Sequence, residues 1–391
     1  MYRRYMIAGT LFLLLLALLA GGPRTRPAQA QALPPGWVQI PLGLPATLNL
    51  TGGYLLPGTD TAWAVGSDGP DGVAILLRRI GDTWRTTAIW RFNAPLRAVV
   101  AVAPDNAWAV GAAGRVTHYD GQSWHDLQTG GAALTYTTIQ MFGAGEEGWV
   151  GGYLDTGNGL DQSIPVLQHY SHGAWQPNVS LPTLGAIYSL HFAGGQGWAV
   201  GTHLWRYTGE TWQPEAEPDP CADPGCYPIY AAVRATGPGA GWAVGSTIRI
   251  CVACRDDLYA VQRSAGGWHP VALPLTAPAD DKLVSRWLEN LAFADAGTGW
   301  AVGGWQADGE DPRPLILRYQ GNHWHVESVP EPARGRLRVI SLADADHALA
   351  MGDGGLVLAY GYAAPAPPAS PTPAPTALPT SRVACAPPPS P

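Results

Sequence analysis

The phrase Trp-Ala-Val-Gly, preceded by Ala or Gly, recurs along the chain and limits its fold more than any other feature. The five full copies and two weaker ones are centred on Trp63, Trp108, Trp149, Trp198, Trp242, Trp300 and Leu349. Successive copies lie 41 to 58 residues apart, which is the length of a four-stranded propeller blade rather than of a short helical repeat. The chain is therefore expected to contain seven repeated units.

A second phrase, Gly-x-x-Trp or Gly-x-Trp, follows each of the first six copies. Its tryptophans are Trp84, Trp124, Trp175, Trp212, Trp268 and Trp324. In the most regular unit, runs at 96–102, 107–111, 115–119 and 123–127 are rich in β-branched or aromatic residues, and turn-forming residues separate them. Each unit is thus predicted to be a four-stranded antiparallel sheet, and the chain an all-β, seven-bladed β-propeller.

The seventh unit has only three runs of its own, at 336–342, 348–352 and 356–360, and no Gly-x-Trp follows them. Residues 36–40, which contain Trp37, resemble a fourth strand but precede the first unit. We expect this N-terminal strand to complete the seventh blade, because joining the two chain ends leaves no open sheet edge at the seam.

The two ends of the chain differ in composition from the repeats. Residues 1–32 carry Arg3 and Arg4, an apolar run and a small-residue cleavage site, as an export signal does. An uncleaved membrane anchor is the alternative, but the apolar run is shorter than the roughly 20 residues of a membrane span. Residues 33–362 are expected to form the propeller, and the Pro-rich residues 363–391 a disordered tail. The protein is accordingly expected outside the cytoplasm, secreted or attached to the cell envelope.

The charge of the chain argues against a nucleic-acid partner. Its formal net charge is −7, and no concentrated basic face of the kind that binds phosphate backbones is visible. Ten His residues are scattered without metal-like spacing, so neither a cofactor nor a catalytic centre is expected.

Four cysteines form two close pairs, Cys221 with Cys226 and Cys251 with Cys254, in connections that emerge at the same end of a propeller. In an exported protein such pairs favour disulfides that clamp the loops of blade five. A zinc site with four Cys ligands is the alternative. Cys385 lies in the tail, either unpaired or bridging to another chain.

Acidic residues gather in the loops at that same end. The segment with Asp155, Asn158 and Asp161 alternates oxygen-bearing side chains with Gly, as calcium-binding loops do. It lacks the bidentate Glu of such loops, and solvated turn residues are the stronger interpretation.

Counting ten or eleven residues back from each copy of the phrase gives the start of each innermost strand. The residues are Gly52, Ala98, Thr138, Tyr188, Ala231, Glu289 and Arg338. Because innermost strands surround the axis, Thr138, Tyr188, Glu289 and Arg338 are the candidate binding residues of one shallow pocket. The alternative is that these polar groups bond one another and only fill space. Trp305, in the expected loop after the second strand of blade six, is a further candidate contact for a partner or sugar.

The blade phrases resemble those of BNR or Asp-box propellers, and in particular of the photosystem II stability and assembly factor-like domain. The resemblance covers residues 36–362. The segment from Thr117 to Trp124 is similar to an Asp box but shorter, and the Arg-Ile-Pro motif of sialidases is absent. The assembly-factor members are scaffolds that hold a partner chain with an arginine-rich patch, whereas the arginines near the inner strands here share no repeated position.

The expected function is that of a non-catalytic, exported scaffold that binds a protein or a glycan of the envelope or the extracellular space. The alternative is a sialidase-like hydrolase acting on glycans, in which Tyr188, Glu289 and Arg338 form part of the site.

Overall fold

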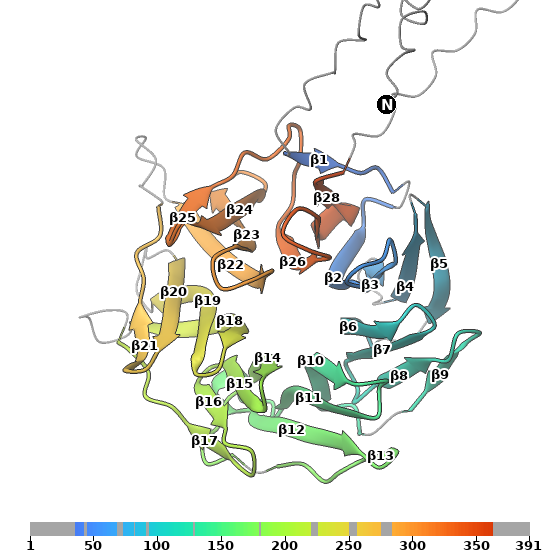
Figure 1. The fold of residues 1–391 in the computed structure, drawn as a ribbon, viewed down its shortest axis with the longest axis vertical. Coiled ribbons are helices and arrows are strands. Elements are labelled where there is room, and N and C mark those ends of the chain that lie inside the picture. Colours follow the sequence, from blue (N-terminus) through green and yellow to red (C-terminus); the bar gives the residue numbers. More distant parts are fainter. Residues whose placement is uncertain are drawn as a thin grey trace, which may run out of the picture. The chain divides into compact units, whose positions relative to one another are not determined.

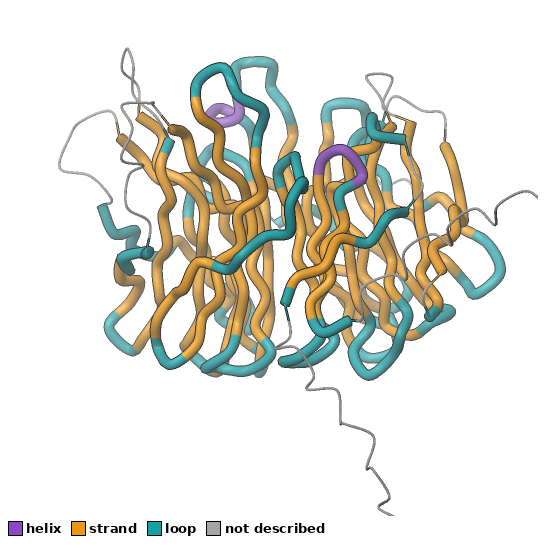
Figure 2. The backbone as a smooth tube through the Cα atoms, turned by 90° about the horizontal axis from the view of Figure 1, so that it is seen from above, coloured by secondary structure: helices purple, strands orange, loops and turns teal. Residues whose placement is uncertain are grey.

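The computed structural model describes residues 36–42, 45–68, 73–81, 83–90, 94–127, 130–179, 181–219, 226–249, 256–274 and 284–362. These residues form a ring of seven four-stranded antiparallel sheets (Figure 1). The innermost strands line a central cavity, which we call the channel. Seen from the side, the strands run between the two ends of the ring and the loops lie at those ends (Figure 2). The proposed export signal, residues 1–32, and the tail, residues 363–391, lie outside the described residues.

Each blade is a meander whose first strand lines the channel. Blades one to three consist of β2 (Leu48–Leu55), β3 (Ala62–Asp68), β4 (Val73–Ile80), β5 (Thr83–Trp90), β6 (Leu96–Ala103), β7 (Asn106–Gly111), β8 (Val116–Tyr119), β9 (Trp124–Asp126), β10 (Leu134–Phe142), β11 (Glu147–Leu154), β12 (Ile164–Ser171) and β13 (Ala174–Trp175). Blades four to six consist of β14 (Ile187–Ala193), β15 (Gln196–Gly201), β16 (Leu204–Tyr207), β17 (Trp212–Pro214), β18 (Cys226–Gly237), β19 (Ala240–Arg249), β20 (Asp257–Ser264), β21 (Gly267–Pro270), β22 (Val284–Phe293), β23 (Gly299–Ala307), β24 (Arg313–Gln320) and β25 (His323–Val326). Two short 3-10 helices, η1 (Leu160–Gln162) and η2 (Asp353–Gly355), interrupt the loops.

Blade seven combines both ends of the propeller. It consists of β26 (Leu337–Leu342), β27 (Ala348–Gly352), β28 (Val357–Tyr360) and, as its outermost strand, β1 (Trp37–Gln39). Trp37 is opposite Tyr360 in the β1–β28 pair, and its ring is buried. The predicted closure by the N-terminal strand is therefore confirmed.

The two tryptophan phrases meet between neighbouring blades. The buried Trp63 of blade one contacts Trp124 of blade two edge-on, with ring centroids 5.4 Å apart. Trp242 of blade five contacts Trp324 of blade six in the same way. At the seam Leu349 takes the place of the tryptophan, and Trp84 of blade one packs against its cluster. Both phrases therefore encode one repeated contact, which buries large aromatic area between sheets.

The glycine that ends each phrase is required by a kink in the innermost strand. In all seven blades the register between the first and second strands shifts by one residue opposite this glycine. In blade six, for example, Gly303 pairs with Leu288 and Val302 with Asn290, which leaves Glu289 unpaired in a β-bulge. A Cβ on Gly303 would stand 1.9 Å from the carbonyl oxygen of Trp287. No side chain fits there.

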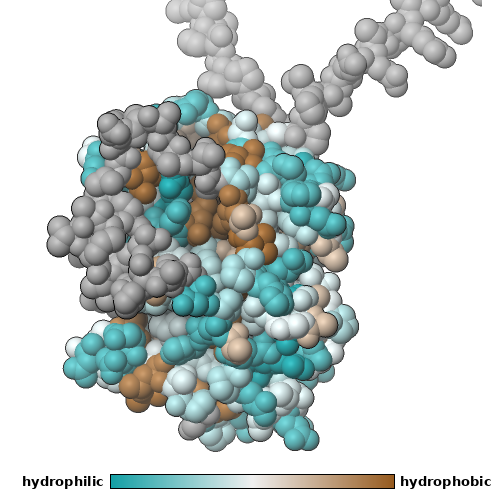
Figure 3. Space-filling view, turned by 90° about the vertical axis from the view of Figure 1, so that its left-hand side faces the viewer, coloured by the Kyte–Doolittle hydropathy of each residue, from teal (hydrophilic) through white to brown (hydrophobic). Residues whose placement is uncertain are grey.

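Where coloured residues are seen in Figure 3, hydrophobic ones form patches among hydrophilic ones. None of the described helices is long and apolar enough to cross a bilayer.

Candidate functional site

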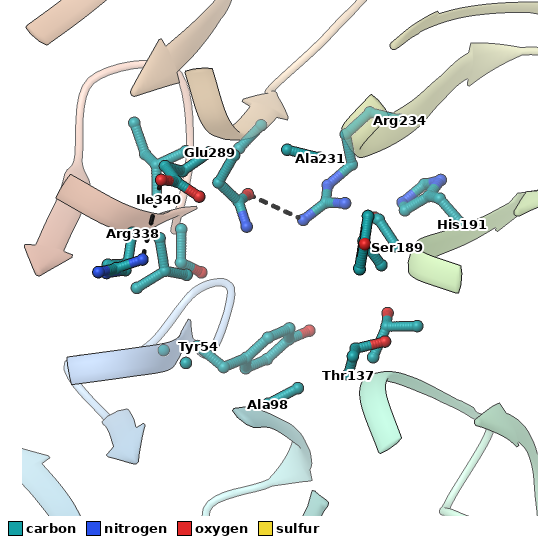
Figure 4. Close-up of a pocket in the computed structure, with 18 of the residues that line it drawn as sticks. Tyr54, Ala98, Thr137, Ser189, His191, Ala231, Arg234, Glu289, Arg338 and Ile340 are labelled. Carbon is teal, nitrogen blue, oxygen red and sulfur yellow. Dashed lines mark hydrogen bonds and ion pairs between the residues drawn. The ribbon is translucent and has the colours of Figure 1, made fainter. Parts of the chain in front are cut away.

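A β-bulge projects one residue of each innermost strand into one end of the channel, which we call the mouth. The seven bulge residues are Thr51, Arg97, Thr137, Tyr188, Ala231, Glu289 and Arg338. All of them line a cavity of about 680 Å³ that occupies the channel. Figure 4 shows Thr137, Ala231, Glu289 and Arg338 among the residues around it. Bulges commonly re-aim side chains next to functional sites.

The positions counted from the sequence coincide with the bulge residues in blades four to seven and lie one residue beyond them in blades one to three. Thr137, not Thr138, is the bulge residue of blade three. Thr138 is buried, and its hydroxyl accepts a 3.3 Å hydrogen bond from the backbone N–H of Leu190 in blade four. Thr138 therefore links two blades. This agrees with the alternative given above, in which the polar residues of the inner strands have a structural role and bind no ligand.

Other polar residues of the inner strands make equivalent links. The hydroxyls of Thr51 and Thr137 donate to the carbonyl oxygens of Leu96 and Ile187 in the next blade, at 2.7 and 2.6 Å. The hydroxyl of Ser189 accepts from the N–H of Val233 at 3.3 Å. Part of the polar channel lining therefore has a structural role.

Arg338 and Glu289 belong to one ionic network at the mouth. Nε of Arg338 lies 2.8 Å from a carboxylate oxygen of Asp353, and its Nη1 lies 3.8 Å from Glu289. Arg336 donates to the same oxygen of Glu289 at 3.0 Å and stacks on Trp287. The two carboxylates raise the pKa of Arg338 against the opposing effect of its burial. The Glu289 side chain thus lies between two guanidinium groups.

Tyr188 is half-buried at the mouth, and burial raises its pKa to about 12. No hydrogen bond joins it to Glu289 among the described residues, so the Tyr–Glu pair expected of a sialidase-like site is not assembled. Arg97, the bulge residue of blade two, is exposed and makes no ion pair with any described carboxylate.

The deeper part of the channel was not anticipated from the sequence. Tyr54, His191 and Arg234 lie three residues beyond the bulges of their strands, opposite the phrase residues Trp63, Trp198 and Trp242. All three line the cavity, and the Tyr54 ring and the Arg234 side chain point into the same space (Figure 4). Because the repeated motif lies on the second strand of each blade, it gives no signal for these positions.

Trp305 is not in a loop. The second strand of blade six continues to Ala307, which places Trp305 within β23, opposite Arg286 and Arg313. Its ring is half-buried against the core, and the guanidinium of Arg313 lies 5.3 Å from the ring centroid. Trp305 is therefore less available to a partner than an exposed loop residue would be.

Of the cysteines, only Cys226 lies among the residues that the structure describes. Cys226 opens β18 and is disulfide-bonded. Cys221, Cys251, Cys254 and Cys385 lie outside the described residues. The pairing within blade five, and the choice between disulfides and zinc for the full set, remain predictions.

The loop proposed for calcium uses its side chains internally. Asp155 accepts a 2.8 Å hydrogen bond from the N–H of Gly157, Asn158 donates to the carbonyl of Thr156, and Asp161 accepts from Gln162. In the part of the chain that the structure describes, no three His, Cys, Asp or Glu side chains are arranged to hold a metal.

One Ser–His–Asp grouping lies outside the channel, in the turn before β9. Nε2 of His125 contacts both Asp120, at 2.7 Å, and Ser123, at 3.2 Å. A catalytic triad needs the carboxylate on the other ring nitrogen, so that the base can face the nucleophile. The grouping is exposed and stabilises a turn.

Comparisons with known proteins agree on the fold. No protein-family model and no curated protein matches the chain. Among solved structures, YCF48 bound to D1 peptide has a TM-score of 0.56 at 16% identity, covering 85% of this chain and 98% of that one. YCF48 from Cyanidioschyzon merolae gives 0.55 at 16%, covering 83% and 98%. The WD40 propeller of Doa1 gives 0.54 at 9%, covering 83% and 97%. This chain therefore shares the propeller fold of the photosystem II assembly factor YCF48, as its blade phrases predicted.

Proposed function

We propose that this protein is an exported, non-catalytic scaffold that binds a segment of a partner protein at the mouth of its channel. The observation that carries the proposal is the ring of bulge residues. The two tryptophan phrases repeat from blade to blade, whereas the seven bulges present Thr, Arg, Tyr, Ala and Glu side chains around one opening. A set of non-repeating groups converging on a concave surface is typical of a recognition site.

A second observation supports a protein rather than a glycan as partner. One of the similar propellers is described as bound to a D1 peptide. An extended peptide can contact several blades at once across a mouth, with Arg97 of blade two and Tyr188 of blade four as anchors of the kinds that dominate protein interfaces.

The proposal is tested by capture on the immobilised full chain, using envelope extract from the source cells. Arg97→Ala combined with Tyr188→Ala should abolish capture of the partner. Arg85→Ala on the outer strand β5 is the matched control, because it removes an equally exposed arginine far from the channel. Equal capture by wild type and the mouth variant would refute the site, and capture of glycan alone would refute the protein partner.

Contact at the mouth can also be measured directly. A photo-crosslinking residue in place of Ala231, at the mouth, should form a covalent adduct with the partner, whereas one in place of Ala174, exposed on the outer strand β13, should not. Export is tested separately by N-terminal sequencing of the mature protein. Its first residue should be the one that follows Ala30 or Ala32.

A further inference from the structure

Arg234 occupies a position whose side chain links neighbouring blades in blades three, four and seven. Three residues beyond the bulge, Gln140, His191 and Ser341 each accept a hydrogen bond from a backbone N–H of the next blade, at 2.8, 3.2 and 2.8 Å. Arg234 occupies this position in blade five. A guanidinium has five N–H donors and no acceptor, so it cannot make this link.

The charge of Arg234 is not neutralised by any described residue. Its Nη1 donates to the carbonyl of its neighbour Val233 at 2.7 Å, and its Nη2 lies 3.5 Å from the side-chain oxygen of Asn290. Both partners are uncharged. Glu289 is the one acidic residue among the described residues lining the cavity, and it pairs with Arg336 and Arg338. A desolvated cation without a counter-ion is costly.

Two further side chains of the channel near Arg234, His191 and Tyr54, can donate hydrogen bonds. Nδ1 of His191 accepts from the N–H of Ala235, which leaves the proton of the neutral ring on Nε2. Burial keeps His191 neutral by lowering its pKa to about 3. Burial also raises the pKa of Tyr54, so its phenol remains a donor at neutral pH. The Tyr54 ring and the Arg234 side chain face the same open space (Figure 4).

We infer that the channel behind the mouth binds a small free anion, a carboxylate or an inorganic oxyanion, held by Arg234 and hydrogen-bonded by Tyr54. The cavity of about 680 Å³ is within the size range of small-molecule pockets. Charge-assisted hydrogen bonds from arginine to oxyanions are among the strongest available to a protein. The site needs no partner protein, and it uses other residues than the bulge ring, although both line the same cavity.

The test is isothermal titration of the full chain with sodium phosphate, sulfate, acetate and citrate, at constant ionic strength set with chloride. At least one anion should bind with a stoichiometry near one and raise the melting temperature. Arg234→Met should weaken that binding about tenfold or more. Arg206→Met, on β16, the third strand of blade four, removes the same charge outside the channel and should leave binding unchanged.

Tyr54→Phe deletes only a hydroxyl, keeps the ring, and should weaken binding several-fold without unfolding the protein. If no anion binds more tightly than chloride, or if Arg234→Met and Arg206→Met bind equally, the inference is wrong. If no anion binds but partner capture still depends on Arg97, the proposed function stands and only the anion site is wrong. If an anion binds through Arg234 but capture does not depend on Arg97, only the proposed function is wrong.

Discussion

The hydroxyl oxygen of Ser341, in the last blade, accepts a 2.8 Å hydrogen bond from the backbone N–H of Leu55 in the first blade, 286 positions away. The same link joins blade three to blade four, where Gln140 accepts from Phe192. The seam of the ring is therefore joined both by the shared sheet of blade seven and by an ordinary contact between neighbouring blades.

Replacing Ser341 with Ala should lower the free energy of unfolding by about 1–3 kcal/mol, because it leaves the buried N–H of Leu55 without an acceptor. Urea denaturation measures the change. Ser264→Ala, at an exposed position on β20, should change stability by less than about 0.5 kcal/mol. Equal effects of the two substitutions would contradict a structural role for the seam bond.

Gly303→Ala should destabilise the protein by about 3 kcal/mol or more, the upper end of overpacking costs, because the new methyl group meets backbone oxygen rather than a movable side chain. Gly131→Ala is the control, since nothing lies within 4 Å of the Cβ that it would add. Both variants receive the same methyl group, and thermal unfolding compares them. A well-tolerated Gly303→Ala would show that the bulge can relax.

The stability of the protein should fall as the pH drops below about 6.5, the ordinary pKa of histidine. Folded His191 has a pKa of about 3, chiefly because of burial. Between these two pKa values the His191 side chain binds a proton in the unfolded chain but not in the folded protein. Its contribution to the free energy of unfolding is therefore complete above pH 6.5 and is lost progressively as the pH falls toward 3.

His191→Gln should reduce this pH dependence while keeping stability near pH 7.5. Glutamine is already used at this position in blade three, where Gln140 makes the same interblade link. Urea denaturation at pH 7.5 and pH 5 measures both effects. His269→Gln, at an exposed site, should retain the wild-type slope, and a similar slope in His191→Gln would mean that other groups cause it.

Trp37→Ala should cost about 3–5 kcal/mol, as for other buried tryptophans, and should match Trp324→Ala within about 1 kcal/mol. The two residues occupy equivalent outer strands and are buried to 6% and 5% exposure. Guanidinium denaturation of both variants tests whether the closing strand β1 contributes as much to the free energy of unfolding as the outer strand of another blade. A cost below about 1 kcal/mol for Trp37 alone would indicate a loosely attached seam.

The sequence predicts most of the fold, because the contacts that build it repeat. Trp37 could be assigned to the last blade by counting, since every other blade supplies its own outer tryptophan. The positions of the bulge residues were harder to predict from the sequence. The turn between the first and second strands varies in length from blade to blade. Thr51 therefore lies twelve residues before Trp63, Tyr188 ten residues before Trp198, and Arg338 eleven residues before Leu349. Fixed spacing therefore selected Thr138 instead of Thr137.

The deep channel could not be predicted at all. Arg234, Tyr54 and His191 take the same place in their blades but differ in charge and shape, and no phrase marks them. Their common surroundings arise only when the ring closes and brings distant strands together. Trp305 was misplaced for a related reason, since β23 is longer than the strand predicted from the repeat.

The β-bulges separate two kinds of constraint. The glycine opposite each bulge is fixed by the backbone, whereas the bulge residue itself ranges from Ala231 to Arg338 without altering its blade. Among the described residues, the bulge residues Arg97, Tyr188 and Ala231 make no hydrogen bond or ion pair to another blade, so we expect these three positions to tolerate substitution one at a time. A propeller of this design can then acquire a new ligand by single substitutions, and these positions give a protein engineer a small combinatorial library on an unchanged frame.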